Sequence, residues 1–396
     1  MYTRILDKKI IYLDFDEIVC NNIIWGFLQI NVDIARGKNK VKMHDGNDDD
    51  ISNAMKMIKD YDVVVTQDFS CVVAEACNKL DKIYVSWVYD CPQRALYTKE
   101  ALYDTNYVFM FDRKGVERLK QFGLKNIFFE PLAANVSQAA AVNISEEDEQ
   151  RYKCDISFVG STYFKSGIEE IIKASPYNIL VEYDKAINNC FMKWNDRIGI
   201  YGSFKDEAID YFYSKLDKNN LEKYDMGKRY LVETLFGARH LTYLERVAVI
   251  NKCAEKHNIR LYTRDENVAG INAKICPPVN SENDIYKVFF LSKINLNITY
   301  RGIETGIPQR IYDIMSVGGF CLSNYQKEIP MLFKEGKDIV LFYDDYDLRN
   351  KLEYYLTHDR ERVEIGINGY RTVCRLYDIG RAVSEILSVL ETVINK

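Results

Sequence analysis

Short apolar runs that end at Asp, Gly or Pro alternate along the first part of the chain with longer stretches of helical periodicity. Two of these helical stretches are SCVVAEACNKL and RKGVERLKQFG, and the apolar runs lie at residues 9–16, 61–68, 82–90, 107–112 and 126–133. Such an alternation is typical of a parallel sheet, whose strands are buried on both faces. This part of the chain therefore predicts an α/β domain.

A second series of the same kind follows. Residues 134–153 have small and then acidic side chains without the alternation, which suits a linker. New apolar runs then lie at 154–160, 259–263, 293–300, 319–324 and 338–344. Residues 165–240 are rich in Tyr, Lys and Asp and predict a mostly helical elaboration. We expect a Rossmann-like domain over 1–150, a second one over 151–375, and a C-terminal helix over 376–396 that packs back on the first domain.

Composition narrows the class of protein. With 396 residues and 47% hydrophobic content, the chain can form two cores, and its net charge of −5 gives no general attraction to nucleic acid. Ten cysteines without a CxxC pair, beside only four histidines, indicate reduced thiols rather than disulfides or zinc ligands. The N-terminus shows no cleavage-site pattern, and no transmembrane segment is visible, so a cytoplasmic protein is expected.

The stretch GIPQRIYDIMSVGGF, residues 306–320, is the most informative one for function. Tandem α/β domains bind ligands at the carboxyl ends of their strands, and Gly306 here leads from such an end into a helix. The free N–H groups of a helix N-terminus favour a phosphate. Arg310 and Asp313 share one helix face, so Arg310 is placed to contact phosphate and Asp313 to accept from a ribose diol. The alternative is that the two side chains only pair with each other.

Four blocks, in order along the chain, carry a resemblance. They are SWVYDCPQRALYTKEALYDTNYVFMFDRKGVERLKQFGLKNIFFEPLAAN, DISFVGSTY, LTYLERVAVINKCAEKHNIRLYT and the segment from SKINLNITYRGIETGIPQRIYDIM to DIVLFYD. These blocks resemble the CgeB-like (spore-maturation) glycosyltransferases, which are group 1-type enzymes of the GT-B fold. The resemblance implies two Rossmann-like α/β domains facing each other across a cleft. It also implies a nucleotide-sugar donor, here taken as a UDP-sugar, bound by the second domain.

The same resemblance implies that an acceptor is bound by the first domain and that neither a metal nor another cofactor is obligatory. Members of the family have an acidic residue at the position that Asp313 occupies in this chain. This acidic residue resembles the second glutamate of the EX7E motif. Eight positions earlier stands Thr305, with Glu304 beside it, so the chain departs from the motif there.

The sequence pattern and the resemblance together define the expected donor site. Gly160 and Ser161 end a strand where glycine lets the backbone approach phosphates, although an ordinary turn is the alternative. Tyr262 and Thr263 could border the base or belong to the core, and Arg301 could neutralise a diphosphate or lie solvated in a loop. The expected donor-binding residues are Gly160, Ser161, Tyr262, Thr263, Arg301, Glu304, Thr305, Gly306, Ile307, Arg310 and Asp313. Arg246 lies on a predicted helix away from the strand ends and is expected to be structural.

Asp90 is the candidate catalytic residue of the first domain. It ends the predicted strand SWVYD, so its carboxylate faces the crevice where an acceptor would lie and could accept the proton of an attacking hydroxyl. Two alternatives remain: Asp90 caps the next helix, or it only orients the acceptor of a retaining enzyme.

The segment IIYLDFDEI suggests rival functions. Asp14 and Asp16 resemble the opening motif of haloacid-dehalogenase-type phosphatases, which use magnesium, and also the DxD motif of GT-A glycosyltransferases. Position 18 is Ile, and no Gly-Asp dipeptide supplies the later acidic cluster of the phosphatases. In the favoured interpretation both aspartates lie on the acceptor side or simply end a strand. A protein that kept the fold as an inactive binding module is the third alternative.

Overall fold

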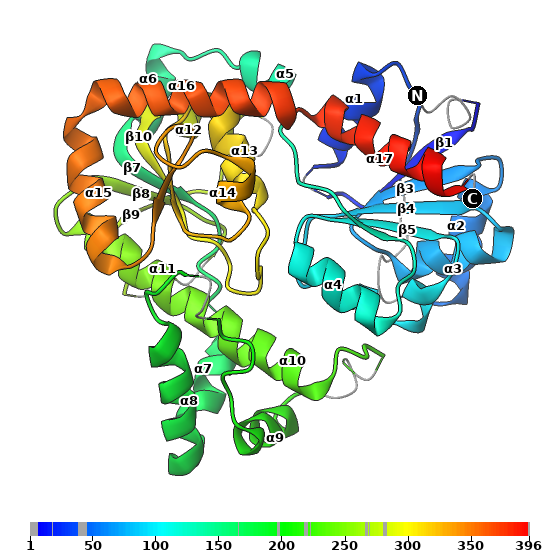
Figure 1. Ribbon diagram of the computed structural model, residues 1–396, viewed down its shortest axis with the longest axis horizontal. Helices are drawn as coiled ribbons and strands as arrows, with labels where there is room; N and C mark the ends of the chain where they lie inside the picture. Colours follow the sequence, from blue (N-terminus) through cyan, green and yellow to red (C-terminus); the bar gives the residue numbers. More distant parts are fainter. Residues whose placement is uncertain are drawn as a thin grey trace. The chain divides into compact units, whose positions relative to one another are not determined.

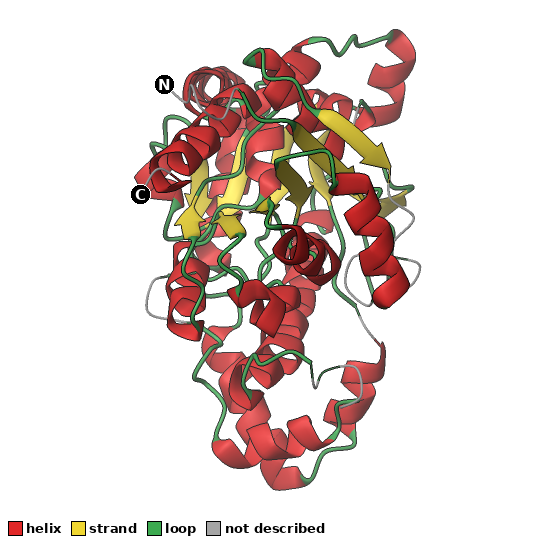
Figure 2. Ribbon diagram, turned by 90° about the vertical axis from the view of Figure 1, so that its right-hand side faces the viewer, coloured by secondary structure: helices red, strands yellow, loops and turns green. Residues whose placement is uncertain are grey.

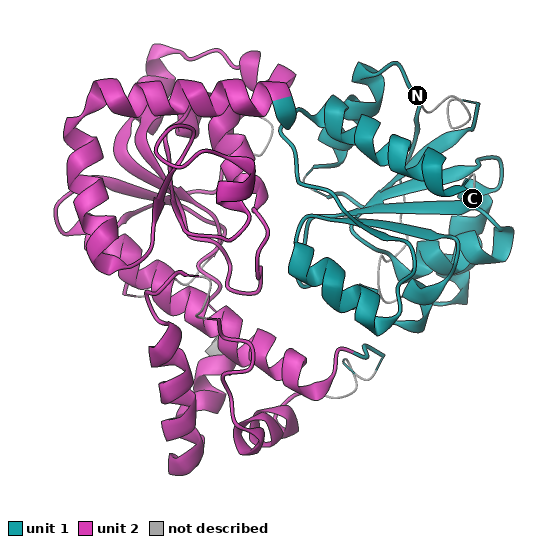
Figure 3. Ribbon diagram, in the orientation of Figure 1, with its two compact units in different colours: residues 1–135, 221–225, 376–396 teal, residues 136–220, 226–375 magenta. Residues whose placement is uncertain are grey.

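The computed structural model divides the chain into two compact units, which Figure 3 shows in two colours. Unit 1 comprises residues 1–135, 221–225 and 376–396, and unit 2 comprises residues 136–220 and 226–375. The structure describes residues 7–17, 19–38, 46–164, 166–195, 199–217, 221, 223–265, 268, 270–279 and 283–394.

Unit 1 contains a six-stranded sheet in which all neighbouring strands are parallel. Its strands are β1(Ile10–Asp14), β2(Ala35–Lys38), β3(Val63–Gln67), β4(Ile83–Val88), β5(Asn106–Met110) and β6(Ile127–Phe129). They are arranged in the order β2-β1-β3-β4-β5-β6. Every residue of β1 and β3 is buried, as their continuous apolar runs require in a sheet covered on both faces.

Helices cover both faces of this sheet. They are α1(Cys20–Gln29), α2(Asp48–Ile58), α3(Cys71–Leu80), α4(Arg113–Phe122), the short 3-10 turns η1(Arg94–Tyr97) and η2(Lys99–Leu102), and the C-terminal α17(Ile379–Ile394). Figure 1 shows α1 and α17 on one side of the sheet and α3 and α4 on the other. Gly26 of α1 lets α17 approach, because a Cβ at this position would lie 2.8 Å from Cγ2 of Val383.

Unit 2 contains a second parallel six-stranded sheet. Its strands are β7(Cys154–Val159), β8(Ile259–Tyr262), β9(Lys274–Cys276), β10(Ser292–Asn297), β11(Cys321–Asn324) and β12(Val340–Phe342). They are arranged in the order β12-β11-β10-β7-β8-β9. The helices around the sheet are α5(Val136–Ala140), α6(Glu146–Tyr152), α11(Arg239–Ala254), α12(Asp284–Leu291), α13(Gln309–Ser316), α14(Ile329–Leu332), α15(Asp345–Thr357) and α16(Asp359–Leu376).

A helical insertion lies between β7 and α11 in the sequence. It consists of α7(Ser166–Lys173), α8(Tyr177–Cys190), α9(Asp206–Ser214), α10(Lys228–Val232) and the π-helical turn η4(Glu233–Ala238). In Figure 2 this part of the molecule is drawn as helices and loops. The insertion has an apolar core of its own, in which Tyr183, Phe204 and Phe212 meet beside η4. The described part of the chain has no helix that is both long and apolar enough to cross a membrane.

The interpretation of residues 134–153 as a linker is wrong, because this stretch forms α5 and α6. Both helices pack on unit 2, α5 against α13 and α6 against α12. Ser145 and Asp148 form a capping box at the start of α6, and the acidic first turn suits the positive end of the helix dipole. Lys287 of α12 pairs with Asp148 at 2.9 Å. The acidic run thus begins a helix rather than a flexible connection.

Candidate functional site

Each sheet has a point at which the strand order changes direction. In unit 2 this point lies between β7 and β10, because the chain adds β8 and β9 on one side of β7 and β10 to β12 on the other. In unit 1 it lies between β1 and β3. Ligands of open parallel sheets bind outside the carboxyl ends of the strands at such points. The candidate sites are therefore the loops after β7 and β10, and those after β1 and β3.

Arg246 reaches the switch point of unit 2, contrary to the expectation that it lies away from the strand ends. It starts from α11, and its Nε donates to the carbonyl oxygen of Ile298, after β10, at 3.0 Å. Its Nη1 donates to the carbonyl oxygen of Ser161, after β7. The guanidinium thereby holds the two loops that border the switch point. The length of the arginine side chain explains the difference, because the position of Cα on a helix does not fix where the charge lies.

The loop after β7 is tied to the loop after β8. Gly160 adopts a φ of 154°, which side chains rarely allow, and Ser161 follows it. Asp265 accepts hydrogen bonds from the hydroxyls of Thr162 at 2.7 Å and Ser161 at 3.0 Å. Thr263 in turn accepts from the backbone N–H of Asp265 at 3.1 Å. We had not expected Asp265, although its place three residues after a strand end could have singled it out.

Two of the expected donor contacts are corrected by the structure. Tyr262 is only 4% exposed, and its ring lies beside that of Tyr152, so it belongs to the core and does not border a ligand site. Arg301 is neither solvated nor available to a diphosphate. Its guanidinium pairs with the fully buried Glu245 at 2.6 Å and donates to the carbonyl oxygen of Lys193 at 2.7 Å. We therefore assign Arg301 a structural role.

Hydrogen bonds from the segment before α14 fix the loop after β10. This loop contains Glu304, Thr305, Gly306 and Ile307. The hydroxyl of Thr305 donates to Oε1 of Glu328 at 2.7 Å, and the N–H of Glu328 donates back to the carbonyl oxygen of Thr305 at 3.1 Å. The side chain of Ile307 is buried, so only its backbone can face a ligand. Glu328, 1% exposed, is thus the buried acid at the position where the chain departs from the EX7E pattern.

Helix α13 carries Arg310 and Asp313 in its first two turns. The helix begins at Gln309 after Pro308. The guanidinium of Arg310 lies 3.8 Å from Asp313, too far for a hydrogen bond, whereas Gln309 donates to Asp313 at 2.8 Å. Burial raises the pKa of Asp313 despite the nearby charge of Arg310. Because the two side chains form only a loose ion pair, mutual pairing does not by itself explain their burial.

At the switch point of unit 1, Asp14 and Asp16 differ in their surroundings. The Asp14 side chain is buried and pairs with Arg36 of β2 at 2.6 Å. Burial acts to raise its pKa, but the hydrogen bonds from Arg36 and from the N–H of Asp16 hold the pKa below its ordinary value. Asp16 is exposed and has a φ of 62°. Asp14 therefore supports the sheet edge, and only Asp16 is open to an acceptor.

Asp90 is exposed just beyond β4, beside a buried carboxyl that we had not singled out. Asp68 follows β3, is 7% exposed, and accepts at Oδ1 from the N–H groups of Tyr89 at 2.8 Å and Asp90 at 3.0 Å. Asp90 does not cap the next helical turn, since Gln93 occupies the N-cap position of η1. Asp68 ends the run YDVVVTQD as Asp90 ends SWVYD, so the same sequence signal could have identified it.

Burial raises the pKa values of the carboxyls around this point. Burial and then the charge of Asp90 raise the pKa of Asp68 to about 7. Burial raises the pKa of Glu17, in the loop after β1, to about 7 as well. Although Asp90 as a residue is exposed, partial desolvation of its carboxyl also raises its pKa. Among the residues that the structure describes, no group of three His, Cys, Asp or Glu side chains could hold a metal ion.

The shift at Glu17 gives a pH-dependent prediction. The pKa of Glu17 is about 7 in the folded protein against 4.5 for a free side chain, so the folded state holds the proton more tightly. The stability it contributes is present at pH 4 and is lost as pH rises to about 7. Glu17→Gln removes that loss, about 3 kcal/mol, and should raise Tm by several degrees at pH 8 but little at pH 5. Calorimetry of this variant and of Glu117→Gln, an exposed control on α4, checks it. An equal change at both pH values contradicts the assignment.

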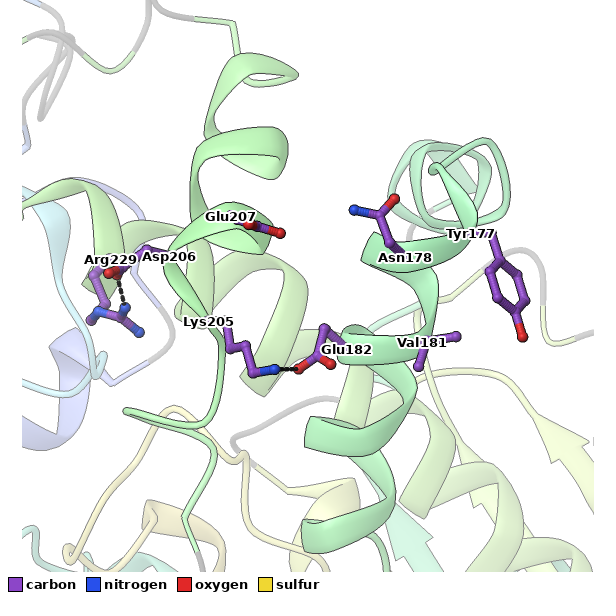
Figure 4. A pocket seen from close by; sticks show the side chains of 8 residues that line it. All are labelled: Tyr177, Asn178, Val181, Glu182, Lys205, Asp206, Glu207 and Arg229. Carbon is purple, nitrogen blue, oxygen red and sulfur yellow. Dashed lines mark hydrogen bonds and ion pairs between the residues drawn. The ribbon is translucent and has the colours of Figure 1, made fainter.

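A pocket of about 640 Å³ lies on the helical insertion of unit 2 and not at the switch point of that unit. Figure 4 shows Glu182 of α8 facing Lys205, and Arg229 facing Asp206. Lys205 pairs with Glu182 at 2.9 Å, and Arg229 pairs with Asp206 at 2.5 Å. Both cations of the pocket are thus neutralised by carboxylates, so we do not place the donor there.

Comparison with solved structures identifies the fold. Anabaena Alr3699/HepE in complex with UDP-glucose is 10% identical, with a TM-score of 0.54 over 98% of this chain and 100% of that chain. Sucrose-phosphate synthase from Thermosynechococcus elongatus is 8% identical, with a TM-score of 0.53 over 98% and 99%. A glycosyltransferase from Rickettsia africae is 12% identical, with a TM-score of 0.50 over 97% and 99%. The chain has the α/β GT-B fold, as expected from its sequence.

Sequence comparison adds the family of one segment. Residues 239–388 match the model of a family described as "Glycosyl transferase-like". No curated protein matches the chain significantly. The matched segment runs from the start of α11 into α17 and includes both Arg246 and α13. Fold and family model together indicate a glycosyltransferase and do not favour the phosphatase.

Proposed function

We propose that the protein transfers a sugar from a UDP-sugar to a hydroxyl acceptor, without a metal or another cofactor, and that it belongs to the CgeB-like group. The observation that carries this proposal is the placement of α13, whose N-terminus, Arg310 and Asp313 follow the loop after β10 at the switch point of unit 2. That arrangement suits a nucleoside diphosphate. HepE, which has the same fold, has been solved in complex with UDP-glucose.

In this proposal the donor lies on unit 2. The N-terminus of α13 and Arg310 contact the diphosphate, and Asp313 accepts from the ribose diol. Gly160 and Ser161 allow the backbone to approach the phosphates. Glu304, Thr305 and Gly306 border the transferred sugar, with Thr305 oriented by Glu328.

The acceptor lies on unit 1, beside Asp90. The acceptor oxygen forms a bond to C1 of the sugar while the bond from C1 to the diphosphate breaks, and UDP leaves with the electron pair. The charge that develops on UDP is stabilised by Arg310 and the helix dipole. In an inverting reaction the hydroxyl proton passes to Asp90, whose raised pKa suits a general base. In a retaining reaction Asp90 only orients the acceptor.

A panel of UDP-sugars incubated with the purified protein tests the proposal. Release of UDP from one member of the panel supports a transferase, because such enzymes slowly transfer the sugar to water. Hydrolysis of p-nitrophenyl phosphate with Mg²⁺, without release of UDP, would favour the phosphatase instead. If the protein binds UDP but turns over no member of the panel, the result would favour the alternative of an inactive binding module.

Donor binding is predicted to be independent of divalent metal. The phosphate contacts proposed here are a helix N-terminus and arginine side chains, which supply the positive charge that a metal supplies elsewhere. Calorimetry should therefore give the same UDP affinity, within twofold, with EDTA and with Mg²⁺. If EDTA abolishes UDP binding, the phosphates are bound through a metal ion, and this part of the proposal is wrong.

A further inference from the structure

Arg246 is a buried cation without an ion-pair partner in the described part of the chain. It is 8% exposed, its hydrogen bonds go to the carbonyl oxygens of Ser161 and Ile298, and none of the described carboxylates forms an ion pair with its guanidinium. The guanidinium also lies over the ring of Tyr163, 4.8 Å from its centroid. Carbonyl dipoles and an aromatic face stabilise a cation but do not neutralise it.

The carboxylates of Glu245 and Asp265, which act electrostatically on Arg246, form ion pairs or hydrogen bonds with other residues. Glu245 pairs with Arg301 at 2.6 Å, and Asp265 accepts from Thr162 and Ser161. Burial and the charge of Arg310 act to lower the pKa of Arg246, whereas Tyr163, Asp265 and Glu245 act to raise it, with a value of about 10 as the result. Arg310 of α13 therefore lies within electrostatic range of Arg246, and the two positive charges oppose each other.

Burying a charge without a counter-charge is costly, and this cost applies to Arg246. Arg301 is a mostly buried arginine of the same unit, and its charge is neutralised by the carboxylate of Glu245. An anion placed near Arg246 would remove this cost, and it would also be attracted by the charge of Arg310, which forms only a loose ion pair with Asp313 at 3.8 Å. Ligands of open parallel sheets bind at such a position, at the carboxyl ends of β7 and β10.

We propose that Arg246 and Arg310 form one anion subsite that takes the diphosphate of the donor. Arg246 is a positioning residue in it: its N–H groups fix the loops after β7 and β10, and its charge attracts the anion. Naming the anion as the diphosphate of UDP rests on the proposed function. The subsite itself rests on the buried charge of Arg246 and on its hydrogen bonds to the loops after β7 and β10.

Arg246→Gln tests the subsite, with Arg362→Gln as the matched control. Arg362 is also a buried arginine of unit 2 that donates to a backbone carbonyl, that of Tyr355 at 2.6 Å, but it pairs with Asp359 on α16. Binding of UDP, inorganic pyrophosphate and uridine is measured by calorimetry, and Tm by thermal unfolding. Arg246→Lys, which keeps the charge and loses the fork of donors, is the second variant.

Arg246→Gln is expected to lower the affinities for UDP and pyrophosphate at least tenfold and to leave the affinity for uridine unchanged. Arg246→Lys is expected to lower the first two affinities by less. Arg362→Gln should lower Tm and leave all three affinities within twofold. If Arg246→Gln binds UDP and pyrophosphate like the parent protein, Arg246 is structural and the inference is overturned. If the parent binds pyrophosphate through Arg246 but does not bind UDP, the subsite stands and the proposed function falls. A parent that binds neither refutes both.

Discussion

Asp90→Asn is expected to lower turnover of the UDP-sugar and acceptor by about 10²- to 10⁴-fold, the range that a general base contributes. Asparagine keeps the size of the side chain but cannot accept the hydroxyl proton. Because Asp90 is exposed and its backbone N–H, which donates to Asp68, is unchanged, the fold should be preserved. UDP affinity should stay the same, since the donor is proposed to lie on unit 2.

Asp62→Asn is the control for this variant. Asp62 precedes β3 at the opposite edge of the same sheet, and its carboxylate accepts a hydrogen bond from the backbone N–H of Lys9 at 2.9 Å. Steady-state kinetics of both variants, with Tm and UDP binding, separate a catalytic role from a structural one. An Asp90→Asn protein with turnover within threefold of the parent would show that Asp90 only orients the acceptor or is not in the site.

Strands that lie in apolar runs were predictable from the sequence, whereas the two edge strands β2 and β9 were not. The runs that contain β1, β3 and β4 are continuously apolar because helices cover both faces of the sheet. Strand β2, with the sequence ARGK, and β9, with the sequence KIC, lie at sheet edges and are exposed on part of their length. Such strands lack the apolar signal, because their neighbours rather than their own residues specify them.

The loops at the carboxyl ends of the strands could be predicted from the sequence, but the partners of their charged side chains could not. The ends of apolar runs point to Asp90, Gly160 and the loop before α13, since carboxyl ends of parallel strands share one edge. Whether an arginine is neutralised depends on residues far away in the sequence. Arg301 meets Glu245 across 56 positions, and Arg246 meets the carbonyl of Ile298 across 52. The partners of these two arginines were therefore not predictable from the sequence.

Asp313→Asn is expected to weaken UDP about ten- to a hundredfold, because a charge-assisted hydrogen bond to the ribose diol is worth roughly 1.5 to 3 kcal/mol. The change keeps the size of the side chain and an acceptor for Gln309, which donates to Asp313 at 2.8 Å. It should therefore preserve α13. The loss should be smaller for 2′-deoxy-UDP, which lacks one of the two hydroxyls and already binds the parent protein less tightly.

Asp359→Asn supplies the control that separates ligand binding from pairing on a helix. Asp359 and Arg362 form an Arg–Asp pair at i and i+3 on α16, at 2.5 Å, a closer contact than the 3.8 Å between Arg310 and Asp313. If pairing were the role of Asp313, its replacement should cost no more than that of Asp359, a few tenths of a kcal/mol in unfolding free energy, and nothing in UDP affinity. Calorimetric titration of UDP and 2′-deoxy-UDP into the parent and both variants decides between the two roles. An Asp313→Asn protein that binds both nucleotides like the parent would show that the acid is structural, and the ribose would then have to lie elsewhere.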